Sequence, residues 1–391
     1  MVPLGQVAEF INGDRGKNYP SEEDFVDAGI PFINAGHLRM GEVDFSDMNH
    51  ISESSFNRLG SGKTKHNDIL YCLRGSLGKT AIVRRNGNAA IASSLVIIRP
   101  SDNCSVGYLY HFLTSPFGHA EVRKFDNGSS QPNLSANSVK SYLLPLPPLA
   151  EQRRIAEVLD RAEALRAKRR AALAQLDSLT QSLFLDLFGD PATNPKGFPR
   201  KPLASLVRGD DTINYGVVQP GDDFDEGVPL VRVGDLIEGK VRHSNLKRIA
   251  PSIEAAYKRS RLRGDEILVS CVGSIGVVAL ADESVKDFNI ARAVARIRLA
   301  ETTDRVFMAA YLCTDFVQRY FTSELRTVSQ PTLNIKQIAE TTVVLPPIPL
   351  QREFARRVTA VEALRTAHRK SLAELDALFA ALQDRAFRGE L

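Results

Sequence analysis

The sequence predicts an α+β protein in which two copies of one mixed α/β domain are separated by a long antiparallel two-helix coiled coil. Two observations lead to this prediction. A set of short segments recurs in the same order half a chain later, and each copy is followed by a long stretch that has no internal glycine and is rich in alanine, leucine and charged residues. The length agrees, because 391 residues suffice for two or three domains of ordinary size.

The repeat consists of matching segments that are offset by 198 residues early in each copy and by 199 later. Its clearest examples are Gly-Ile-Pro-Phe-Ile against Gly-Val-Pro-Leu-Val, and Gly-Ser-Leu-Gly against Gly-Ser-Ile-Gly. The matched segments are 29–38 with 227–236, 69–70 with 267–268, 75–78 with 273–276, 131–134 with 330–333, and 146–148 with 345–347. A period of half the chain indicates a tandem duplication and not a solenoid of short repeats.

Each copy has the pattern of a mixed α/β domain. Short apolar runs, such as 68–73 and 90–98, are separated by glycine and polar turns, which is typical of strands. A helical stretch follows, around 108–122 in the first copy and 306–325 in the second. A Pro-Pro pair then ends the globular part, because proline removes a backbone donor and forces the preceding residue out of the helical region.

The segment after each Pro-Pro pair predicts a helix roughly 55–60 Å long. Apolar residues recur along it at spacings of three and four, and so narrow a stripe on so long a helix needs a partner in water. We therefore expect the two stripes to pair as a coiled-coil seam. The alternative is two separate surface helices, each folded onto its own domain. The predicted seam residues are Ile155, Leu159, Leu173, Leu176, Leu183, Val358, Val361, Leu372, Leu375 and Leu382.

These elements divide the chain into four parts. The parts are a first globular domain at 1–147, a first long helix at 148–190, a linker with the second globular domain at 191–345, and a second long helix at 346–391. Glycine and proline residues just after the first helix mark the break between the two halves, because both residue types end helices.

The composition excludes several classes of protein. Hydrophobic residues make up 43% and charged residues 25% of the chain, which excludes wholesale disorder. No apolar run approaches eighteen residues and no signal sequence is evident, so we expect a cytoplasmic protein. Cys72, Cys104, Cys271 and Cys313 lack a CxxC spacing, and we expect buried, reduced thiols. The net charge of +4 permits a polyanionic partner without requiring one.

No segment carries a recognisable catalytic motif. Residues 75–80 end like a phosphate-binding loop, but Leu73 stands where the first glycine is needed, and Val277 and Val278 replace Lys-Thr in the second copy. We interpret the loop as a tight connection between strands, with glycines at positive φ. HExxH, Cys/His ligand sets, Gly-x-Ser-x-Gly and the Asn/Asp-Pro-Pro-Tyr/Phe segment of amino-methyltransferases are also missing. We expect no catalytic residue, metal or cofactor in this chain.

Basic clusters are the positive functional signal. Residues 58–85 contain seven lysines and arginines against one acid, and 240–263 contain eight against one. Such clusters suit the neutralisation of nucleic-acid phosphates, with a solvated surface as the alternative. The candidate phosphate or guanine contacts are Lys63, Lys65, Arg74, Lys79, Lys258, Arg261 and Arg263. The candidate adenine contacts are Gln131, Asn133 and Gln330, whose amides can alternatively secure their own loops.

The whole chain resembles the specificity subunits of type I restriction–modification enzymes. The most specific parts are the openings of the two long helices, Leu-Pro-Pro-Leu-Ala-Glu-Gln-Arg-Arg-Ile-Ala at 146–156 and Leu-Pro-Pro-Ile-Pro-Leu-Gln-Arg-Glu-Phe-Ala at 345–355. The segment 182–191, and the Gly-Ser-x-Gly and Gln-Pro-x-Leu patterns of both copies, add to the resemblance.

The resemblance implies that each globular domain is a target-recognition domain for one part of a bipartite DNA sequence. An asymmetric target is implied, because the copies differ strongly around 41–59 and 240–257. The paired helices would measure the gap between the two parts and dock two modification (methyltransferase) subunits, which restriction (translocase and nuclease) subunits then join. S-adenosylmethionine, ATP and Mg²⁺ would belong to those partners, and the chain would not be an enzyme by itself.

Two other functions stay open on the residues alone. One is a two-domain coiled-coil scaffold that binds protein or RNA, which symmetric loops without a basic excess would favour. The other is an enzyme with an unrecognised active site, which cleavage or methyl transfer by the isolated chain would reveal.

Overall fold

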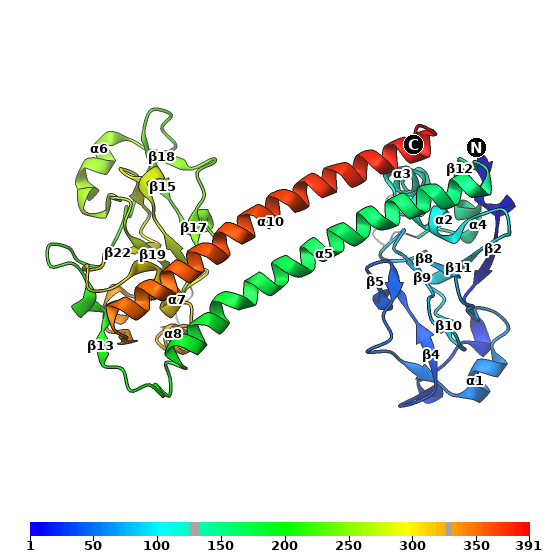
Figure 1. Cartoon of the computed structure of the whole chain (residues 1–391), viewed down its shortest axis with the longest axis horizontal. Coiled ribbons are helices and arrows are strands. Elements are labelled where there is room, and N and C mark those ends of the chain that lie inside the picture. Colours follow the sequence, from blue (N-terminus) through cyan, green and yellow to red (C-terminus); the bar gives the residue numbers. More distant parts are fainter. Residues whose placement is uncertain (126–132, 326–330) are drawn as a thin grey trace. The chain divides into compact units, whose positions relative to one another are not determined.

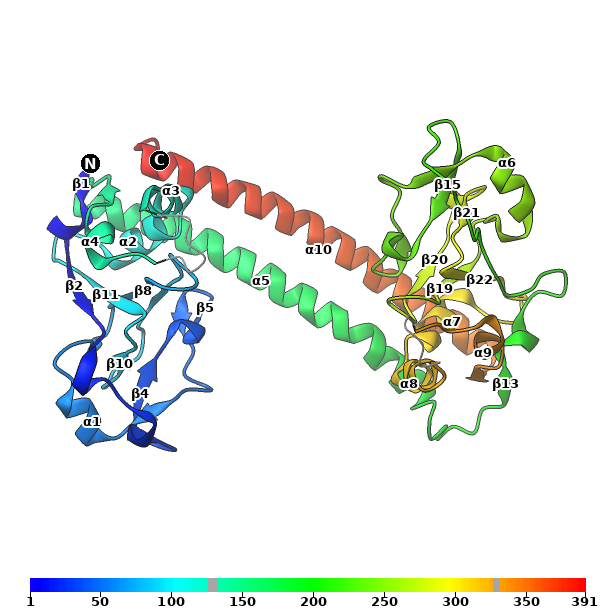
Figure 2. The same cartoon turned by 180° about the vertical axis from the view of Figure 1, so that it is seen from behind.

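The chain folds into two compact units, each of which holds one globular domain and one part of each long helix. The residues that this computed structural model describes are 1–125, 133–325 and 331–391. Unit 1 is Met1–Ala171 together with Arg369–Leu391, and unit 2 is Ala172–His368. Figure 1 and Figure 2 show the elements of each unit from two sides.

The globular part of unit 1 is built on a six-stranded sheet with the order β2-β11-β8-β9-β6-β5. Neighbours pair antiparallel except for β6 and β9, which are parallel. A four-stranded sheet, β10-β4-β7-β3, and the pair β1-β12 accompany it. The strands are β1 Val2–Pro3, β2 Ala8–Asn12, β3 Phe25–Val26, β4 Ile30–Ile33, β5 Leu38–Arg39, β6 Glu42–Val43, β7 His50–Ile51, β8 Ile69–Cys72, β9 Thr80–Ile82, β10 Ala90–Ile91, β11 Leu95–Pro100 and β12 Leu143–Leu144. The short helices are α1 Glu53–Arg58, α2 Val106–Leu113, α3 Pro116–Phe125 and α4 Ala136–Lys140.

The globular part of unit 2 repeats this plan. Its six-stranded sheet has the order β14-β22-β19-β20-β17-β16, with the same pairing senses strand by strand. A three-stranded sheet, β18-β15-β21, and the pair β13-β23 accompany it. The strands are β13 Arg200–Pro202, β14 Asn214–Tyr215, β15 Val228–Val231, β16 Leu236–Ile237, β17 Lys240–Val241, β18 Lys247–Ile249, β19 Ile267–Ser270, β20 Val278–Leu280, β21 Asn289–Ile290, β22 Val294–Ile297 and β23 Thr342–Val344. The short helices are α6 Pro251–Glu254, α7 Arg305–Leu312, α8 Asp315–Ser323 and α9 Ile335–Ala339. The predicted duplication is confirmed.

The central strand of each six-stranded sheet is buried on both faces. In β8, Ile69 and Tyr71 pack toward α2 and the long helices, whereas Leu70 and Cys72 pack into a second cluster on the other side. Successive strand side chains point to opposite faces, so a strand covered on both sides is apolar throughout. That explains why this segment is a continuous apolar run in the sequence.

The two long helices pair antiparallel. In unit 1 the first part of α5 (Leu149–Phe188) lies beside the last part of α10 (Ile348–Arg388), where Arg166 Nε is 2.6 Å from Asp376 Oδ1. In unit 2 the last part of α5 lies beside the first part of α10, where Arg365 Nε is 3.2 Å from Asp177 Oδ1. The predicted antiparallel helix pair is confirmed.

The predicted seam residues differ in burial along the helices. The buried ones are Ile155, Leu159, Val358 and Val361, and the half-buried ones are Leu173, Leu176, Leu183, Leu372, Leu375 and Leu382. Ile155 and Leu159 belong to the core of unit 1, and Val358 belongs to that of unit 2. The stripe therefore serves domain packing near the helix ends as well as the helix pair.

A buried glutamine joins each long helix to the domain before it. The Gln152 side-chain amide donates to the carbonyls of Pro147 (2.9 Å) and Asn103 (3.0 Å), and its Oε1 accepts from the Ser105 backbone N–H at the start of α2 (2.8 Å). Gln351 repeats this arrangement with Pro346 (2.7 Å) and the Asp304 N–H (2.9 Å). The shared glutamine of the Leu-Pro-Pro segments thus satisfies backbone groups at a helix junction.

The structure corrects one helix prediction and confirms one turn. The stretches predicted as single helices are each split, into α2 and α3 and into α7 and α8. The break in unit 1 falls where Pro116 begins a new helix and the Ser115 hydroxyl donates to the Phe112 carbonyl, 2.7 Å away. The predicted tight connection is confirmed, because Gly75 and Gly78 have φ of +79° and +76° between β8 and β9.

Two further predictions concern the burial of the cysteines and membrane-spanning segments. Cys72, Cys104 and Cys271 are buried as expected, but Cys313 is exposed. It is the C-terminal cap residue of α7, and its backbone N–H donates to the Ala309 and Ala310 carbonyls. Among the described residues, no helix combines the length and the apolar character needed to cross a membrane.

Candidate nucleic-acid interface

Unit 1 brings two predicted residues together at one end of its central strand. Arg74 follows β8 and forms a bridge with Asn133, and Arg74 Nε lies 3.4 Å from Asn133 Oδ1. Both side chains are exposed and line a cavity of about 450 Å³. The other polar residues of this cavity are Asn12, Arg15, Ser135, Asn137 and Ser138. Amide, hydroxyl and guanidinium groups in one groove offer hydrogen bonds to base edges and phosphates alike.

The three lysines predicted in unit 1 have different surroundings. Lys63 is half-buried, with Nζ 4.9 Å from the centre of the Phe56 ring, and Lys79 Nζ donates to the Ala35 carbonyl at 2.8 Å. Lys65 is exposed. Lys63 and Lys65 precede β8 whereas Arg74 and Lys79 follow it, so the structure places these cations at opposite ends of the strand. They do not form one continuous patch around Arg74.

In unit 2 the basic segment 258–263 combines buried anchoring residues with exposed cations. Ser260 and Leu262 are buried, and the Ser260 hydroxyl donates to Asn289 Oδ1 at 2.7 Å. Lys258 and Arg263 are exposed. The segment begins in a 3₁₀ helix, Ala255–Ser260, and continues without regular structure, so the buried side chains of Ser260 and Leu262 hold it while Lys258 and Arg263 face solvent.

Arg261 is the member of this segment that is tied inward. Its guanidinium forms a bidentate ion pair with the buried carboxylate of Glu254, with Nε–Oε1 at 2.8 Å and Nη2–Oε2 at 2.6 Å. These hydrogen bonds lower the pKa of Glu254 below its ordinary value, and the same contact raises the pKa of Arg261. A contact from Arg261 to nucleic acid stays a prediction, and in the structure this side chain holds the segment in place.

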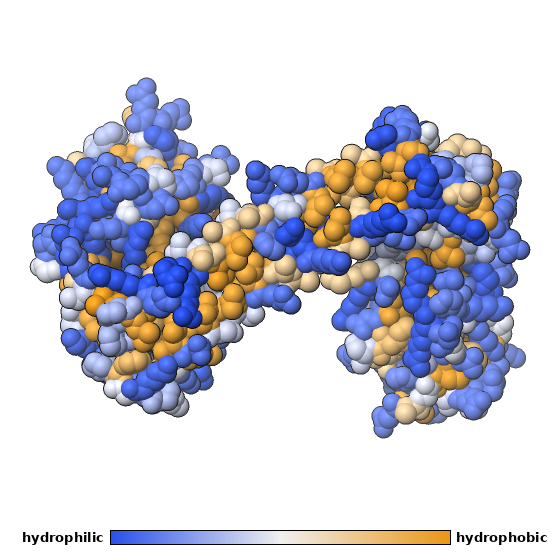
Figure 3. Space-filling view, viewed as in Figure 1, coloured by the Kyte–Doolittle hydropathy of each residue, from blue (hydrophilic) through white to orange (hydrophobic). Residues whose placement is uncertain are grey.

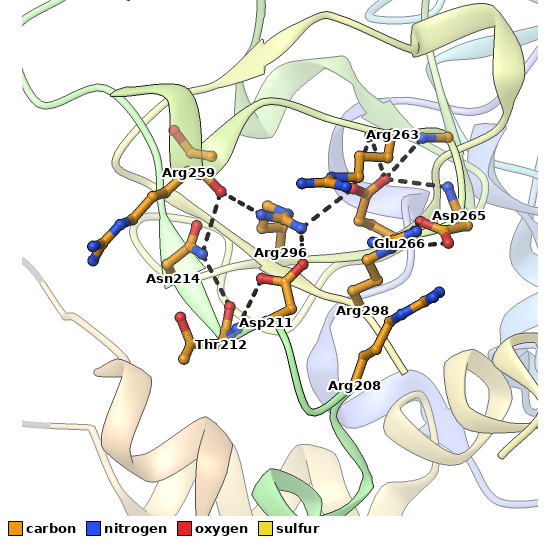
Figure 4. Close-up of polar contacts among 12 residues, drawn as sticks. Arg208, Asp211, Thr212, Asn214, Arg259, Arg263, Asp265, Glu266, Arg296 and Arg298 are labelled. Atoms are coloured by element: carbon orange, nitrogen blue, oxygen red, sulfur yellow. Dashed lines mark hydrogen bonds and ion pairs between the residues drawn. The ribbon is translucent and has the colours of Figure 1, made fainter. Parts of the chain in front are cut away.

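A buried polar network supports the same segment from beneath (Figure 4). Arg296 in β22 is 3% exposed and donates to the Arg259 carbonyl and to the Asp211 carboxylate. Its guanidinium also lies 3.5 Å from Glu266 Oε1. Glu266 in turn accepts from the backbone N–H of Arg263 at 2.8 Å. The network therefore fixes the backbone at both Arg259 and Arg263.

Sequence reasoning missed three side chains that the structure places beside the candidates. The Arg259 backbone carbonyl accepts from Arg296, but the Arg259 side chain is exposed and points away from this network (Figure 4). Asn12 and Arg15 line the groove of Arg74 although they lie about sixty residues earlier in the chain. Arg259 lies within the basic cluster at 240–263, which was a signal for it. No local signal pointed to Asn12 or Arg15, because strand pairing brings β2 there.

Two predicted residues lie outside the described part of the chain. They are Gln131 and Gln330, which belong to segments 126–132 and 326–330. Asn133, the third amide candidate, accepts a hydrogen bond from Arg74, so loop anchoring and base recognition both stay open for it.

The chain matches the family described as the type I restriction modification DNA specificity domain over residues 1–175 and 215–377. The type I restriction enzyme EcoBI specificity subunit of Escherichia coli is 32% identical over 320 residues, which span 74% of this chain and 66% of that protein. The EcoKI specificity subunit of E. coli strain K12 is 23% identical over 418 residues, which span 100% of this chain and 89% of that protein.

Solved structures agree with the fold. A chain from a type I restriction–modification system, whose structure addresses complex assembly and conformational transition, has a TM-score of 0.61 at 20% identity and covers 100% of this chain and 97% of its own. The S subunit from M. genitalium has a TM-score of 0.60 at 15% identity, covering 98% and 95%. Because the family match extends over both globular domains and most of the chain, the protein belongs to the type I restriction modification DNA specificity family.

Proposed function

We propose that this chain is the DNA-specificity subunit of a type I restriction–modification complex and that each globular domain reads one part of a bipartite, asymmetric target. The observation that carries the proposal is that the two globular domains share one strand order but present different side chains at matched positions. Both domains have the same strand order, yet Arg74 and Asn133 of the unit 1 groove correspond to Val272 and Thr332 in unit 2. Side chains that differ on equal frameworks suit the reading of two different sequences.

The exposed cations supply the sequence-independent part of this binding. Lys65 and Arg74 in unit 1, and Lys258 and Arg263 in unit 2, are exposed around ordered backbone. Lysine and arginine contacts to phosphates position a protein on the duplex, and contacts to base edges then specify the sequence. In this arrangement the buried pairs, such as Arg261 with Glu254, serve to hold the loops that do the reading.

The antiparallel helix pair takes the role of spacer and docking surface in this proposal. It sets the gap between the two parts of the target and holds two modification (methyltransferase) subunits, to which restriction (translocase and nuclease) subunits are added. The support is the family membership and the continuity of each helix with the domain before it through Gln152 and Gln351. S-adenosylmethionine, ATP and Mg²⁺ are assigned to those partners, and this chain supplies recognition without catalysis.

The test is a map of methylated adenines across the host genome with the gene intact, disrupted and restored. We expect one bipartite, asymmetric motif to lose its methylation on disruption and to regain it on restoration. Persistence of every motif, together with failure of the chain to co-purify with a methyltransferase, would reject the proposal and favour a protein- or RNA-binding scaffold.

A further inference from the structure

A cavity of about 810 Å³ lies within unit 2, among the end of α5, the start of α10, α7 and the strand β20. Its wall is apolar where Ala309 and Ala310 of α7 and Phe184 of α5 line it. Elsewhere the wall carries charges of both signs, among them Arg365 and Glu362 of α10 and Arg305 of α7. Figure 3 shows hydrophobic residues gathered over this part of unit 2. The volume falls in the range of sites that hold a small organic molecule.

The duplication shows how this cavity arises. Aromatic residues of unit 1 are replaced by small residues at the matched positions of unit 2, offset by 199. The matched pairs are Tyr110 with Ala309, His111 with Ala310, and Phe379 with Thr180. A side chain on Gly41 would collide with the Tyr110 hydroxyl, whereas a Cβ on the matched Gly239, which lines the cavity, would meet no described atom within 4 Å. Unit 2 therefore has open space where unit 1 has a ring.

In unit 1 an arginine carries one of these rings on its face. The Arg166 guanidinium lies 4.3 Å from the centre of the Phe379 ring, and its edge is held by Glu163 and by Asp376, 2.6 Å from Nε. The ion pairs hold the guanidinium over the ring, an arrangement favoured by cation–π attraction.

In unit 2 the matched arginine, Arg365, lies beside the matched acids without the ring, and its Nη2 also donates to the Leu176 backbone carbonyl at 3.0 Å. Arg365 pairs with Glu362 and lies 3.2 Å from Asp177 Oδ1 without the alignment of a hydrogen bond, and only 15% of its side chain is exposed. Thr180 stands where the ring-bearing residue would be, and its Oγ1 is buried without a hydrogen-bond partner among the described residues. A buried hydroxyl without a partner is costly unless a ligand or water completes it.

We propose that this cavity binds a small planar aromatic molecule, whose ring lies on the Arg365 guanidinium as the Phe379 ring lies on Arg166. The ligand's ring occupies the space that the three aromatic side chains fill in unit 1, and a polar substituent on it reaches the Thr180 hydroxyl. The site is specific to unit 2, because in unit 1 the chain supplies the rings itself.

The experiment uses Cys313, which lines the cavity and is exposed while the other three cysteines are buried. The rate at which a thiol reagent alkylates Cys313 in the full-length chain is measured with p-cresol, the side chain of tyrosine, and with methylcyclohexanol, its saturated analogue. We expect p-cresol to slow alkylation about tenfold at a concentration ten times its dissociation constant. Equal protection by both compounds, or none by p-cresol, overturns the proposal.

A matched pair of substitutions separates the ring contact from general stability. Arg365→Met and Arg166→Met each remove the same ion pairs from equivalent places, but only Arg365 faces the cavity. We expect Arg365→Met to weaken p-cresol binding by roughly two- to thirtyfold and Arg166→Met to leave it unchanged. Equal effects overturn the proposal.

A filled-cavity variant and the assembled complex complete the test. Thr180→Phe places in unit 2 the residue that unit 1 has, and we expect it to abolish protection by p-cresol while the melting temperature is kept or raised; continued protection overturns the proposal. The proposal is also overturned if methyltransferase subunits by themselves protect Cys313 and exclude p-cresol, because a partner side chain then occupies the cavity.

Discussion

Units 1 and 2 keep one backbone plan while their buried charges are paired differently. Both begin the central strand after a buried acid, Asp68 in unit 1 and Glu266 in unit 2. Arg99 of unit 1 forms a bidentate pair with Asp68, with distances of 2.8 and 2.9 Å. In unit 2, Glu266 instead accepts from three successive backbone N–H groups (residues 263–265) and faces Arg296, which stands where unit 1 has Ile97.

The difference shows which parts of the duplicated domain are free to change. Sheet order depends on backbone hydrogen bonds and on apolar side chains in the core, and both are kept. Buried charges need only a partner of opposite sign, so their identity and direction can vary as long as they stay satisfied. In unit 2 the buried charges of Arg296 and Glu266 instead anchor the backbone of the basic segment 258–263.

The largest effect on stability is expected from removing the positive charge of Arg296, which has no counterpart at the matched position of unit 1. Arg296→Met leaves the buried Glu266 and the half-buried Asp211 without their cation, and we expect a loss of about 3–5 kcal/mol in the free energy of unfolding of unit 2. Hydrogen exchange measured by mass spectrometry reports each unit separately. The conservative Ile97→Val in unit 1 serves as the control and should cost about 1 kcal/mol. Unchanged protection of β19 and β22 would contradict the role given to Arg296.

The second largest effect is expected on the salt dependence of DNA binding, which should differ between exposed and ion-paired cations of this chain. Lys258→Ala with Arg263→Ala should lower the slope of log affinity against log salt by about two, because each exposed cation neutralises about one phosphate. Arg261→Ala should change that slope by less than one, since its charge is matched by Glu254. Anisotropy titrations of a labelled duplex at several salt concentrations measure the slopes. A full unit of change for Arg261 would mean that it leaves Glu254 on binding.

Removing the buried glutamine at each helix junction should destabilise the chain less, and by equal amounts in the two units. Gln152→Met and Gln351→Met remove hydrogen bonds at equivalent helix junctions and leave backbone groups unsatisfied, and each should cost about 1–3 kcal/mol. Denaturant unfolding of the two variants tests whether the junctions are equivalent. A large inequality would show that one junction has an additional support.

The smallest effect concerns acid stability. Because the pKa of Glu254 is lowered in the folded chain, its stabilising contribution is complete above the ordinary value of 4.5 and is lost as the pH falls below that value toward the folded-state pKa. We expect Glu254→Gln to flatten this part of the pH dependence of unit 2 stability, by no more than about 1 kcal/mol because Arg261 is partly exposed. An unaltered pH profile would assign the acid sensitivity to other carboxylates.

Much of the architecture was predictable because it depends on patterns along the chain. The 198-residue offset indicated the duplication, and the apolar stripes after each Pro-Pro pair indicated paired helices. The split of each shorter helical stretch was not predicted, because in unit 1 it depends on Ser115 and Pro116 acting together at one point. The exposure of Cys313 was missed because the general expectation of buried thiols takes no account of where each cysteine lies in the fold.

The sequence by itself determined the two-copy plan, the helix pair and the family, because periodicity, helix-ending residues and repeated motifs are properties of neighbouring residues. Only the tertiary structure decided which cations are exposed. Lys258 and Arg261 have the same charge three residues apart, yet one is exposed and the other is paired with Glu254. The cavity beside Arg365 also depends on the fold, because α5, α7 and α10 come together there from distant parts of the chain. Electrostatic pairing and packing act through space, and the fold sets which residues meet.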